Sequence, residues 1–103
     1  MKKGLNETCY KFFSTLANPT RLAIMEHLMN SPMSVSEITG ALNQEQSMVS
    51  HNLRKLARCG FVSSDSKGNM RVYHGNHETF EALLQVIDNH AKKYCPTGGK
   101  CKQ

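Results

Sequence analysis

The sequence predicts a mainly α-helical domain with one small β-hairpin, in the order helix, helix, helix, helix, hairpin, helix. Three observations support this prediction. The chain has 103 residues, which suits one domain. Apolar residues recur about every three or four positions over most of it, as in amphipathic helices. Two short stretches of strand-forming residues flank the turn-forming segment Ser66-Lys67-Gly68-Asn69. We expect the domain to cover residues 1–94 and residues 95–103 to form a flexible, cysteine-containing tail.

The first two helices meet at Asn18-Pro19. Asparagine caps helix N-termini well, and proline suits the first helical position because it lacks an N–H there. The apolar residues with helical spacing in the first helix are Leu5, Cys9, Phe12, Phe13 and Leu16, and the apolar face of the second comprises Leu22, Met25, Leu28 and Met29. Asn30-Ser31-Pro32 should end the second helix.

Ser34 and Glu37 have the spacing of a capping box, which predicts the start of a short third helix. A polar turn at 43–45 separates it from a fourth helix over Gln46–Arg58, and Gly60 is a suitable stop. The expected core residues are Ile38, Ala41 and Leu42 in the third helix, and Val49, Leu53, Leu56 and Ala57 in the fourth.

Phe61–Asp65 and Met70–His74 are the two expected strands of the hairpin. A last helix over His77–Tyr94 follows, and its apolar stripe comprises Phe80, Leu83, Leu84, Ile87, Ala91 and Tyr94. Two short helices joined by a tight turn and followed by a hairpin are the layout of a winged helix-turn-helix domain.

The fourth helix carries polar and basic side chains opposite its apolar stripe. Gln pairs with adenine, Arg with guanine and Ser with several bases, so these side chains suit contact with DNA. The expected contact residues of this helix are Gln46, Ser47, Ser50, His51 and Arg54. Lys67 and Arg71 of the hairpin would touch phosphates. The simpler alternative is an ordinary solvated helix face.

Charge placement favours the DNA interpretation. The chain has 13 Lys and Arg against 8 Asp and Glu, a net charge of +5. Five of the basic residues lie in the fourth helix and hairpin, opposed there by Asp65 alone, whereas the last helix carries acidic residues. The five histidines are dispersed and form no catalytic constellation, so we expect no enzyme. No apolar run approaches the roughly 18 residues of a membrane span, and no signal peptide is evident, so we expect a cytoplasmic protein without membrane contact.

These residues resemble the ArsR/SmtB family of winged helix-turn-helix repressors. The similarity lies in Leu-Ala-Asn-Pro-Thr-Arg-Leu at 16–22, Ser-Met-Val-Ser-His-Asn-Leu-Arg-Lys-Leu at 47–56, Gly60-Phe61-Val62, Gly68 and Val72-Tyr73. It covers roughly residues 10–90. The resemblance implies a homodimer joined through its first and last helices, which represses a promoter by binding an inverted-repeat operator in double-stranded DNA. It also implies release of the operator when a metal or another signal binds.

Two sensor sites known in the family fit this sequence poorly. The first places thiolates at the start of the third helix, where Ser34 and Ser36 stand here, and a hydroxyl is a poor ligand for a soft metal. The second uses carboxylates and imidazoles across the last helices of the dimer. His77 and His90 have a different spacing from that site, with other residues at expected ligand positions.

The cysteines are the remaining sensor candidates. Cys95 and Cys101 bracket a Pro-Thr-Gly-Gly-Lys turn, and arsenite-responsive relatives also carry cysteines just past the last helix. Trivalent arsenic takes three thiolates, and Cys9 is the candidate third. We therefore expect no obligatory cofactor, and arsenite or another soft metal ion as effector. Cys9 as a plain core residue remains open, and Cys59 is expected to be a packing residue.

Two alternatives remain for the function as a whole. A regulated disulfide in the tail would make the protein a thiol redox or persulfide-responsive repressor of the same fold. Outside this class, the winged helix could serve protein–protein interaction with no role in DNA binding.

Overall fold

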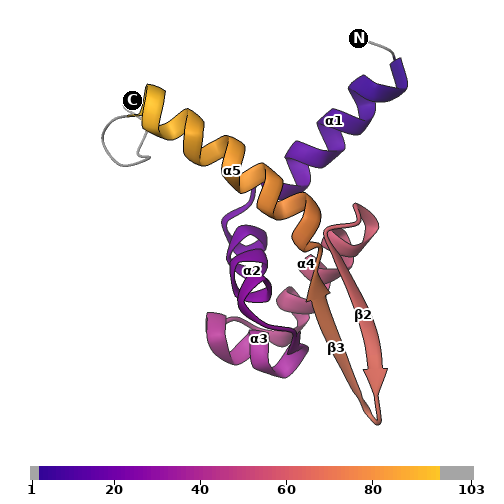
Figure 1. Ribbon diagram of the computed structural model, residues 1–103. Helices are drawn as coiled ribbons and strands as arrows, with labels where there is room; N and C mark the ends of the chain where they lie inside the picture. Colours follow the sequence, from indigo (N-terminus) through magenta and orange to yellow (C-terminus); the bar gives the residue numbers. More distant parts are fainter. Residues whose placement is uncertain (1–2, 96–103) are drawn as a thin grey trace.

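The computed structural model describes residues 3–95 of the chain (Figure 1). Its order of helices and hairpin is the predicted one. The elements are α1 (Lys3–Leu16), α2 (Pro19–Asn30), β1 (Met33–Ser34), α3 (Val35–Leu42), α4 (Gln46–Arg58), β2 (Val62–Lys67), β3 (Met70–Gly75) and α5 (His77–Tyr94). None of the helices in this part of the chain is long and apolar enough to cross a membrane.

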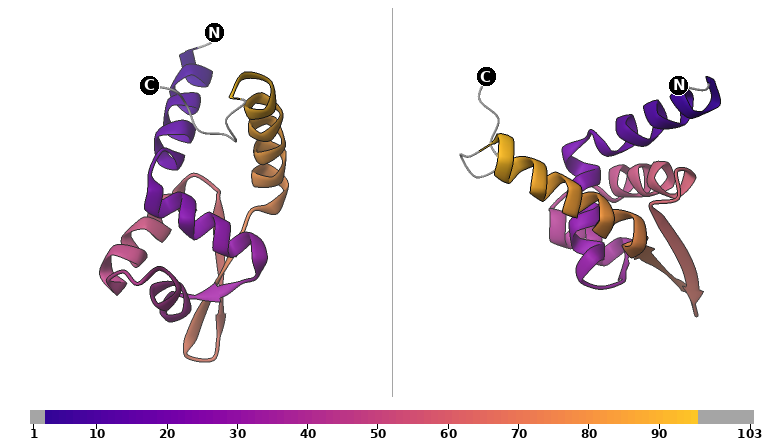
Figure 2. Two further views of the ribbon diagram at one scale, coloured as in Figure 1. Left: turned by 90° about the vertical axis from the view of Figure 1, so that its left-hand side faces the viewer. Right: turned by 45° about the horizontal axis from the view of Figure 1, so that its top comes forward.

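The molecule consists of a body, two arms and a wing. Helices α2, α3 and α4 form the body, α1 and α5 leave it as diverging arms, and the β2–β3 hairpin projects from the end away from the arms (Figure 1). The two further views agree with this arrangement (Figure 2). Principal extents of 46 × 35 × 23 Å reflect the projecting arms and wing.

The helix ends lie where local chemistry predicts them. Asn18 Oδ1 accepts a hydrogen bond from the backbone N–H of Arg21 at 3.0 Å, and Pro19 takes the first helical position of α2. At the start of α3, the Glu37 N–H donates to Ser34 Oγ at 3.2 Å, and the Ser34 N–H donates to Glu37 Oε1 at 2.9 Å. The pKa of Glu37 is held below its ordinary value chiefly by the hydrogen bond that the Ser34 backbone N–H donates to its carboxylate, with a contribution from the Ser34 side chain. Gly60 follows α4 with φ +77°.

The hairpin extends into a small antiparallel sheet with strand order β1-β3-β2. Val62 pairs with Gly75 and Lys67 with Met70, so both strands run past their predicted ends and leave Gly68-Asn69 as the turn. Gly68 has φ +62°, which a residue without Cβ adopts readily. Strand β1 was not predicted, because its two residues become a strand only by pairing with Val72 and Tyr73 of β3.

The hydrophobic core lies in the body and at the base of the arms. Its buried members are Leu16, Ile24, Met25, Leu28, Ile38, Val49, Leu53, Leu56, Phe61, Val62 and Phe80. Among the apolar residues predicted for the buried faces of α2, α3 and α4, three are exposed instead: Leu22, Ala41 and Ala57. Leu22 lies on the flank of α2 that faces the arms, and the buried face of this helix centres instead on Ile24, Met25 and Leu28.

The predicted apolar stripes of the first and last helices also lie mostly outside the core of the protomer. Leu16 and Phe80, at the bases of the arms, are buried, whereas Leu5 and Phe13 of α1 and Ile87 of α5 are exposed. The reason is geometric: the arms diverge from the body, so the outer turns of each arm have little of the same chain to pack against (Figure 1).

Candidate nucleic-acid interface

Helix α4 has one buried face and one solvent-facing face. Val49, Leu53 and Leu56 are completely buried, which fixes the rotation of the helix on the body. On the other side, four of the five predicted contact residues are exposed, namely Gln46, Ser47, His51 and Arg54. The fifth, Ser50, is half-buried. The outward face therefore combines hydrogen-bonding and basic groups on a rigid support, as base-edge contact requires.

Met48 also lies on this helix and is 46% exposed. The sequence interpretation omitted it, because an apolar residue in an amphipathic helix is normally assigned to the core. An exposed thioether beside polar groups suits contact with the methyl group of thymine. The exposure of Met48 could have been inferred from its neighbour. Val49 occupies the buried face, and successive residues of a helix differ by about 100°, so Met48 points away from that face.

The wing carries Lys67 and Arg71 near its tip. Ser66 pairs with Arg71 and Lys67 with Met70 across the turn, and both basic side chains are exposed. Arg71 Nη1 donates a hydrogen bond of 2.8 Å to Ser64 Oγ, which orients the guanidinium along the hairpin. The acidic residue of the hairpin, Asp65, lies with Oδ2 3.0 Å from His74 Nε2. This is an ion-pair distance without hydrogen-bond geometry.

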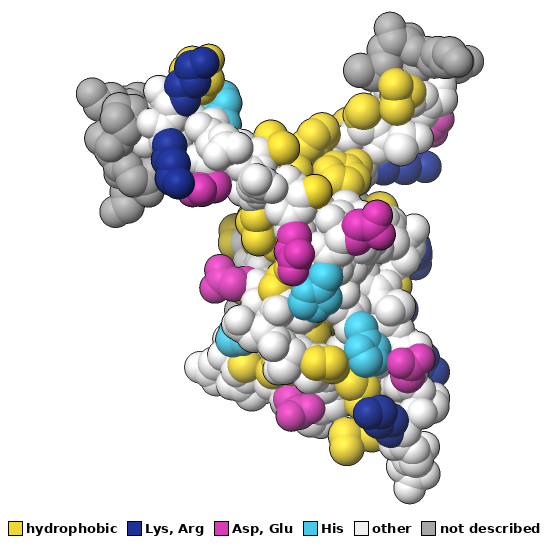
Figure 3. Space-filling model, viewed as in Figure 1, with side chains coloured by type: hydrophobic (Ala, Val, Ile, Leu, Met, Phe, Trp, Pro, Cys, Tyr) yellow, Lys and Arg dark blue, Asp and Glu magenta, His cyan; other side chains and the backbone are white. Residues whose placement is uncertain are grey.

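Acidic residues gather on α5, away from α4 and the wing tip. Glu78, Glu81 and Asp88 are all exposed there. Magenta carboxylates are visible along the α5 arm and at its base in Figure 3, and others lie lower on the molecule. Lys92 Nζ lies 3.1 Å from Asp88 Oδ2 and partly offsets its charge, and His77 Nδ1 lies 3.4 Å from Glu81 Oε1. The positive charge that attracts a polyanion is thus concentrated on α4 and the wing.

The buried side of α4 also contains a polar residue whose position the sequence did not reveal. Asn52 is 6% exposed. Its Oδ1 accepts a hydrogen bond of 2.9 Å from Arg21 Nη1, and its Nδ2 donates one of 3.0 Å to the carbonyl of Met48. The Asn-Pro-Thr-Arg segment at the start of α2 was the available signal for a buried polar contact. Nothing in the local sequence indicates which residue Arg21 contacts.

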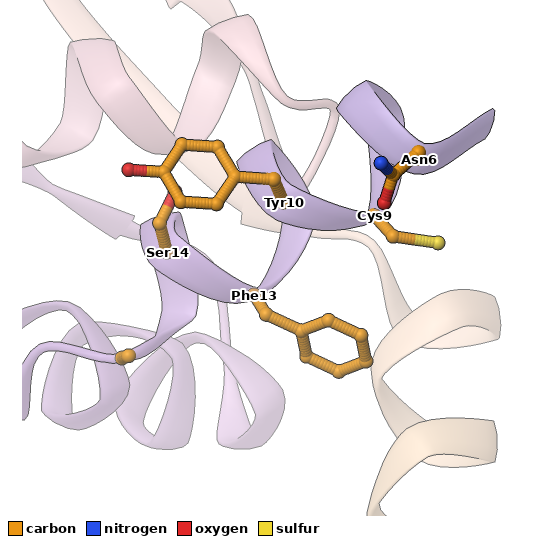
Figure 4. Close-up of a pocket in the computed structure, with 6 residues that line it drawn as sticks. Asn6, Cys9, Tyr10, Phe13 and Ser14 are labelled. Carbon is orange, nitrogen blue, oxygen red and sulfur yellow. The ribbon is translucent and has the colours of Figure 1, made fainter. Parts of the chain in front are cut away.

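The candidate effector residues are only partly within the described structure. Cys9 lies half-buried on α1 beside a cavity of about 470 Å³, lined also by Asn6, Tyr10 and Phe13. Cys9 and Phe13 point to the side on which α5 lies, and Tyr10 points away (Figure 4). Cys95 is the C-cap residue of α5, and Cys101 lies outside the described residues. Within residues 3–95, no three His, Cys, Asp or Glu side chains come together as a metal site.

Ser34, at the position of a family metal ligand, and Cys59, expected to be a packing residue, both make local structural contacts in this chain. Ser34 uses its hydroxyl to cap α3, which adds a second reason why it is not a metal ligand. Cys59 packs against the core, and its Sγ lies 3.1 Å from Thr15 Oγ1 of α1.

An apolar groove of about 510 Å³ runs between the bases of the two arms. Its lining includes Phe13, Leu16, Leu22, Phe80, Leu83 and Ile87. Phe13 is 59% exposed and Ile87 is 51% exposed, so this face is uncovered in the single chain. Yellow side chains at the junction of the arms show the same band in Figure 3.

The helix-turn-helix formed by α3 and α4, followed by the β2–β3 wing, defines a winged helix-turn-helix protein. Residues 18–64 match the sequence model described as "Bacterial regulatory protein, arsR family". The chain is similar to this family over that segment, which is a little under half of its length. Its model and the relatives below are regulators and not enzymes, in agreement with the sequence-based expectation.

Two curated relatives illustrate the match. The chain is 45% identical to the HTH-type transcriptional regulator NmtR of Mycobacterium tuberculosis over 58 residues, 56% of this chain and 48% of that protein. It is 28% identical to the arsenical resistance operon repressor of Staphylococcus xylosus over 83 residues, 77% of this chain and 80% of that protein. The chain thus spans about half the length of the first of these relatives.

Solved structures are similar over most of the chain. Rv0081 of M. tuberculosis superimposes with a TM-score of 0.82 at 29% identity, covering 93% of this chain and 97% of that one. The homodimeric winged helix-turn-helix DNA-binding domain (fragment 1–100) from Mycobacterium bovis has a TM-score of 0.76 at 26% identity, covering 88% and 87%.

Proposed function

We propose that this chain is a transcriptional repressor that binds operator DNA as a homodimer and releases it on sensing a signal. The observation that carries the proposal is the outward face of α4. Most of its proposed contact residues are exposed opposite a completely buried face, and strand β2 of the basic wing packs against the same helix. This is the arrangement by which a recognition helix enters the major groove while a flanking element holds the backbone.

The proposed contacts divide into two kinds. Gln46, Ser47, Ser50, His51 and Arg54 read base edges, because their donors and acceptors match the patterns of the major groove. Lys67 and Arg71 neutralise phosphates, which adds affinity and fixes the register but discriminates little between sequences.

The groove between the arms supports the homodimer. A face with this much exposed apolar surface costs free energy in water, and a second copy related by a two-fold axis would cover it with the same face. The M. bovis relative is described as homodimeric, in line with this assignment. A two-fold dimer presents two copies of α4 in opposite directions, so its operator is an inverted repeat.

For the effector, we propose a soft metal or metalloid such as arsenite, bound by Cys95 and Cys101 with Cys9 as third thiolate. Soft ions prefer thiolates. Cys9 on α1 faces the side of α5, and Cys95 ends α5, so both lie on the arms. The arms diverge in one chain, and a dimer that pairs them supplies the geometry for ligands from two chains. The relative from S. xylosus, a repressor of an arsenical resistance operon, supports this effector class.

DNA binding is tested with a duplex of about 30 base pairs, selected from a random pool by the wild-type protein and labelled for fluorescence anisotropy. His51→Ala/Arg54→Ala should lose the selected duplex while remaining a dimer. Lys92→Ala, which removes an exposed charge from α5, is the matched control and should bind normally. Wild-type affinity in the double variant contradicts the recognition-helix assignment.

Salt dependence separates DNA binding from a protein-interaction role. Lys67 and Arg71 of both chains make four proposed phosphate contacts per dimer, which predict a slope of log affinity against log salt of about −4. Selection that enriches no sequence, together with a slope near zero, would favour the winged helix as a protein-interaction module.

The effector is tested by titrating the reduced protein–DNA complex with arsenite, zinc and a polysulfide. Arsenite should dissociate the wild-type complex. Cys95→Ser and Cys101→Ser should bind DNA normally and resist arsenite. Cys59→Ser, which removes a thiol by the same change but keeps a hydroxyl as partner for Thr15 Oγ1, should still respond. Release by polysulfide but not by arsenite would replace the metalloid proposal with the thiol redox one. Release of the Cys95→Ser/Cys101→Ser protein by arsenite would place the sensor elsewhere.

A further inference from the structure

Arg21 connects three helices. Its backbone N–H donates to the Asn18 cap of α2 at 3.0 Å. Its Nε donates to the carbonyl oxygen of Thr15, in the last turn of α1, at 2.6 Å, and its Nη1 donates to Asn52 Oδ1 of α4 at 2.9 Å. One half-buried guanidinium therefore joins the arm α1 to the helix that carries the proposed base contacts.

The chemistry of Asn52 fixes the orientation of this link. Its Nδ2 must point to a hydrogen-bond acceptor, which is the Met48 carbonyl at 3.0 Å, and its Oδ1 must point to a donor, which is Arg21. With the amide reversed, its NH2 group would face the guanidinium of Arg21, and its oxygen would face the carbonyl oxygen of Met48. Because the donor is charged, the bond between Arg21 and Asn52 belongs to the stronger class of hydrogen bonds.

A second contact joins the same turn of α1 to the end of α4. Thr15 Oγ1 lies 3.1 Å from Sγ of Cys59, the C-cap residue of α4. Asn52 and Cys59 are about two helical turns apart. Two attachment points at that separation restrain both sliding and tilting of α4 relative to α1, whereas a single contact would act as a pivot.

We propose that Arg21 is a positioning residue that sets α4 against α1 for sequence-specific DNA reading, so that the geometry of the arms controls the geometry of the base contacts. The inference rests on the proposed function, since it concerns how the recognition helix is held. The half-buried Arg21 side chain is bonded to Thr15 and to Asn52 on the buried side of α4, so it is not one of the proposed DNA contacts. Its loss should impair the discrimination between sequences more than the attraction to phosphates, because the basic side chains of the wing remain in place.

The experiment compares the selected duplex with a shuffled duplex of the same composition, for wild type, Arg21→Ala, Asn52→Ala and the double variant. We expect Arg21→Ala to lower affinity for the selected duplex about tenfold. Affinity for the shuffled duplex should change less than twofold. The double variant should be no weaker than the weaker single variant, because both changes break the same bond between Arg21 and Asn52, which links α1 to α4. Losses that multiply in the double variant would overturn the proposal.

A purely structural role is excluded by two further variants. Ser34→Ala removes the cap of α3 and is the matched control for lost stability, so it should leave the ratio of the two affinities unchanged. Arg21→Lys keeps the charge, but one ammonium group cannot reproduce the paired Nε and Nη1 bonds, so it should lose discrimination almost as Arg21→Ala does. If Arg21→Ala does not fold, the Arg21→Lys variant tests the proposal by itself. Discrimination between the two duplexes at the wild-type level in Arg21→Lys would contradict the positioning role.

The two levels of proposal fail differently. A wild-type protein that does not distinguish the selected from the shuffled duplex contradicts the DNA-binding function itself. The positioning role alone is contradicted if the wild-type protein distinguishes the two duplexes but Arg21→Ala lowers the affinity for both duplexes by the same factor.

Discussion

Replacing Ile87 with alanine should weaken the proposed homodimer measurably. Ile87 lines the groove between the arms and is 51% exposed in the single chain. Burying an isoleucine side chain completely contributes about 2 kcal/mol, so covering the exposed half contributes about 1 kcal/mol per copy. A two-fold interface contains the residue twice, which gives about 2 kcal/mol, or roughly a 30-fold higher dimer dissociation constant.

Sedimentation equilibrium over a concentration series measures this change directly. The matched control is Met70→Ala, because Met70 is 55% exposed and lies beside the wing turn, far from the arms. We expect the dissociation constant of this control to equal that of wild type. If Ile87→Ala and Met70→Ala dimerise equally well, the groove is not the dimer interface and the reasoning from its exposure is wrong.

Three further predictions concern the stability of the body. Leu53→Ala should lower the free energy of unfolding by about 2–5 kcal/mol in urea titrations, because this completely buried side chain leaves a cavity. Ser34→Ala should cost about 1 kcal/mol through loss of the α3 cap, with unchanged secondary structure by circular dichroism. Since the folded-state pKa of Glu37 is lowered, its stabilising contribution is present above the ordinary value of 4.5 and is lost as the pH falls through the folded-state pKa. Glu37→Gln should therefore unfold with a weaker dependence on pH in that acidic range than wild type.

The sequence predicted the helix ends well because their determinants are local. The Asn18 cap and the Ser34–Glu37 box each act within three residues, so their pattern is sufficient. Strand β1 depends instead on pairing with β3, almost forty residues later in the chain, and two residues carry no pattern of their own. Leu22 was assigned to the core because it follows helical spacing, but its side of α2 faces the groove and not the body.

The candidate interface shows the same division. The outward face of α4 could be predicted, since the amphipathic pattern separates Val49 and Leu53 from the polar residues. The buried position of Asn52 could not, because a buried amide is stable only when a specific partner satisfies it. That partner, Arg21, is 31 residues away in the chain.

The short connection between α1 and α2 couples the position of α1 to the position of α4 in the proposed positioning role of Arg21. Only Ala17 and Asn18 separate these helices, and the Ala17 N–H still donates to the Phe13 carbonyl at 2.8 Å, so the link has little freedom to absorb a movement of the arm. A displacement of α1 must then reach α4, through Arg21 and through Cys59. An inverted repeat places its half-sites about 34 Å apart, and two recognition helices match that spacing only within a narrow range. Since Cys9 lies on α1, an ion bound there by thiolates of two chains would act on the element that sets this spacing.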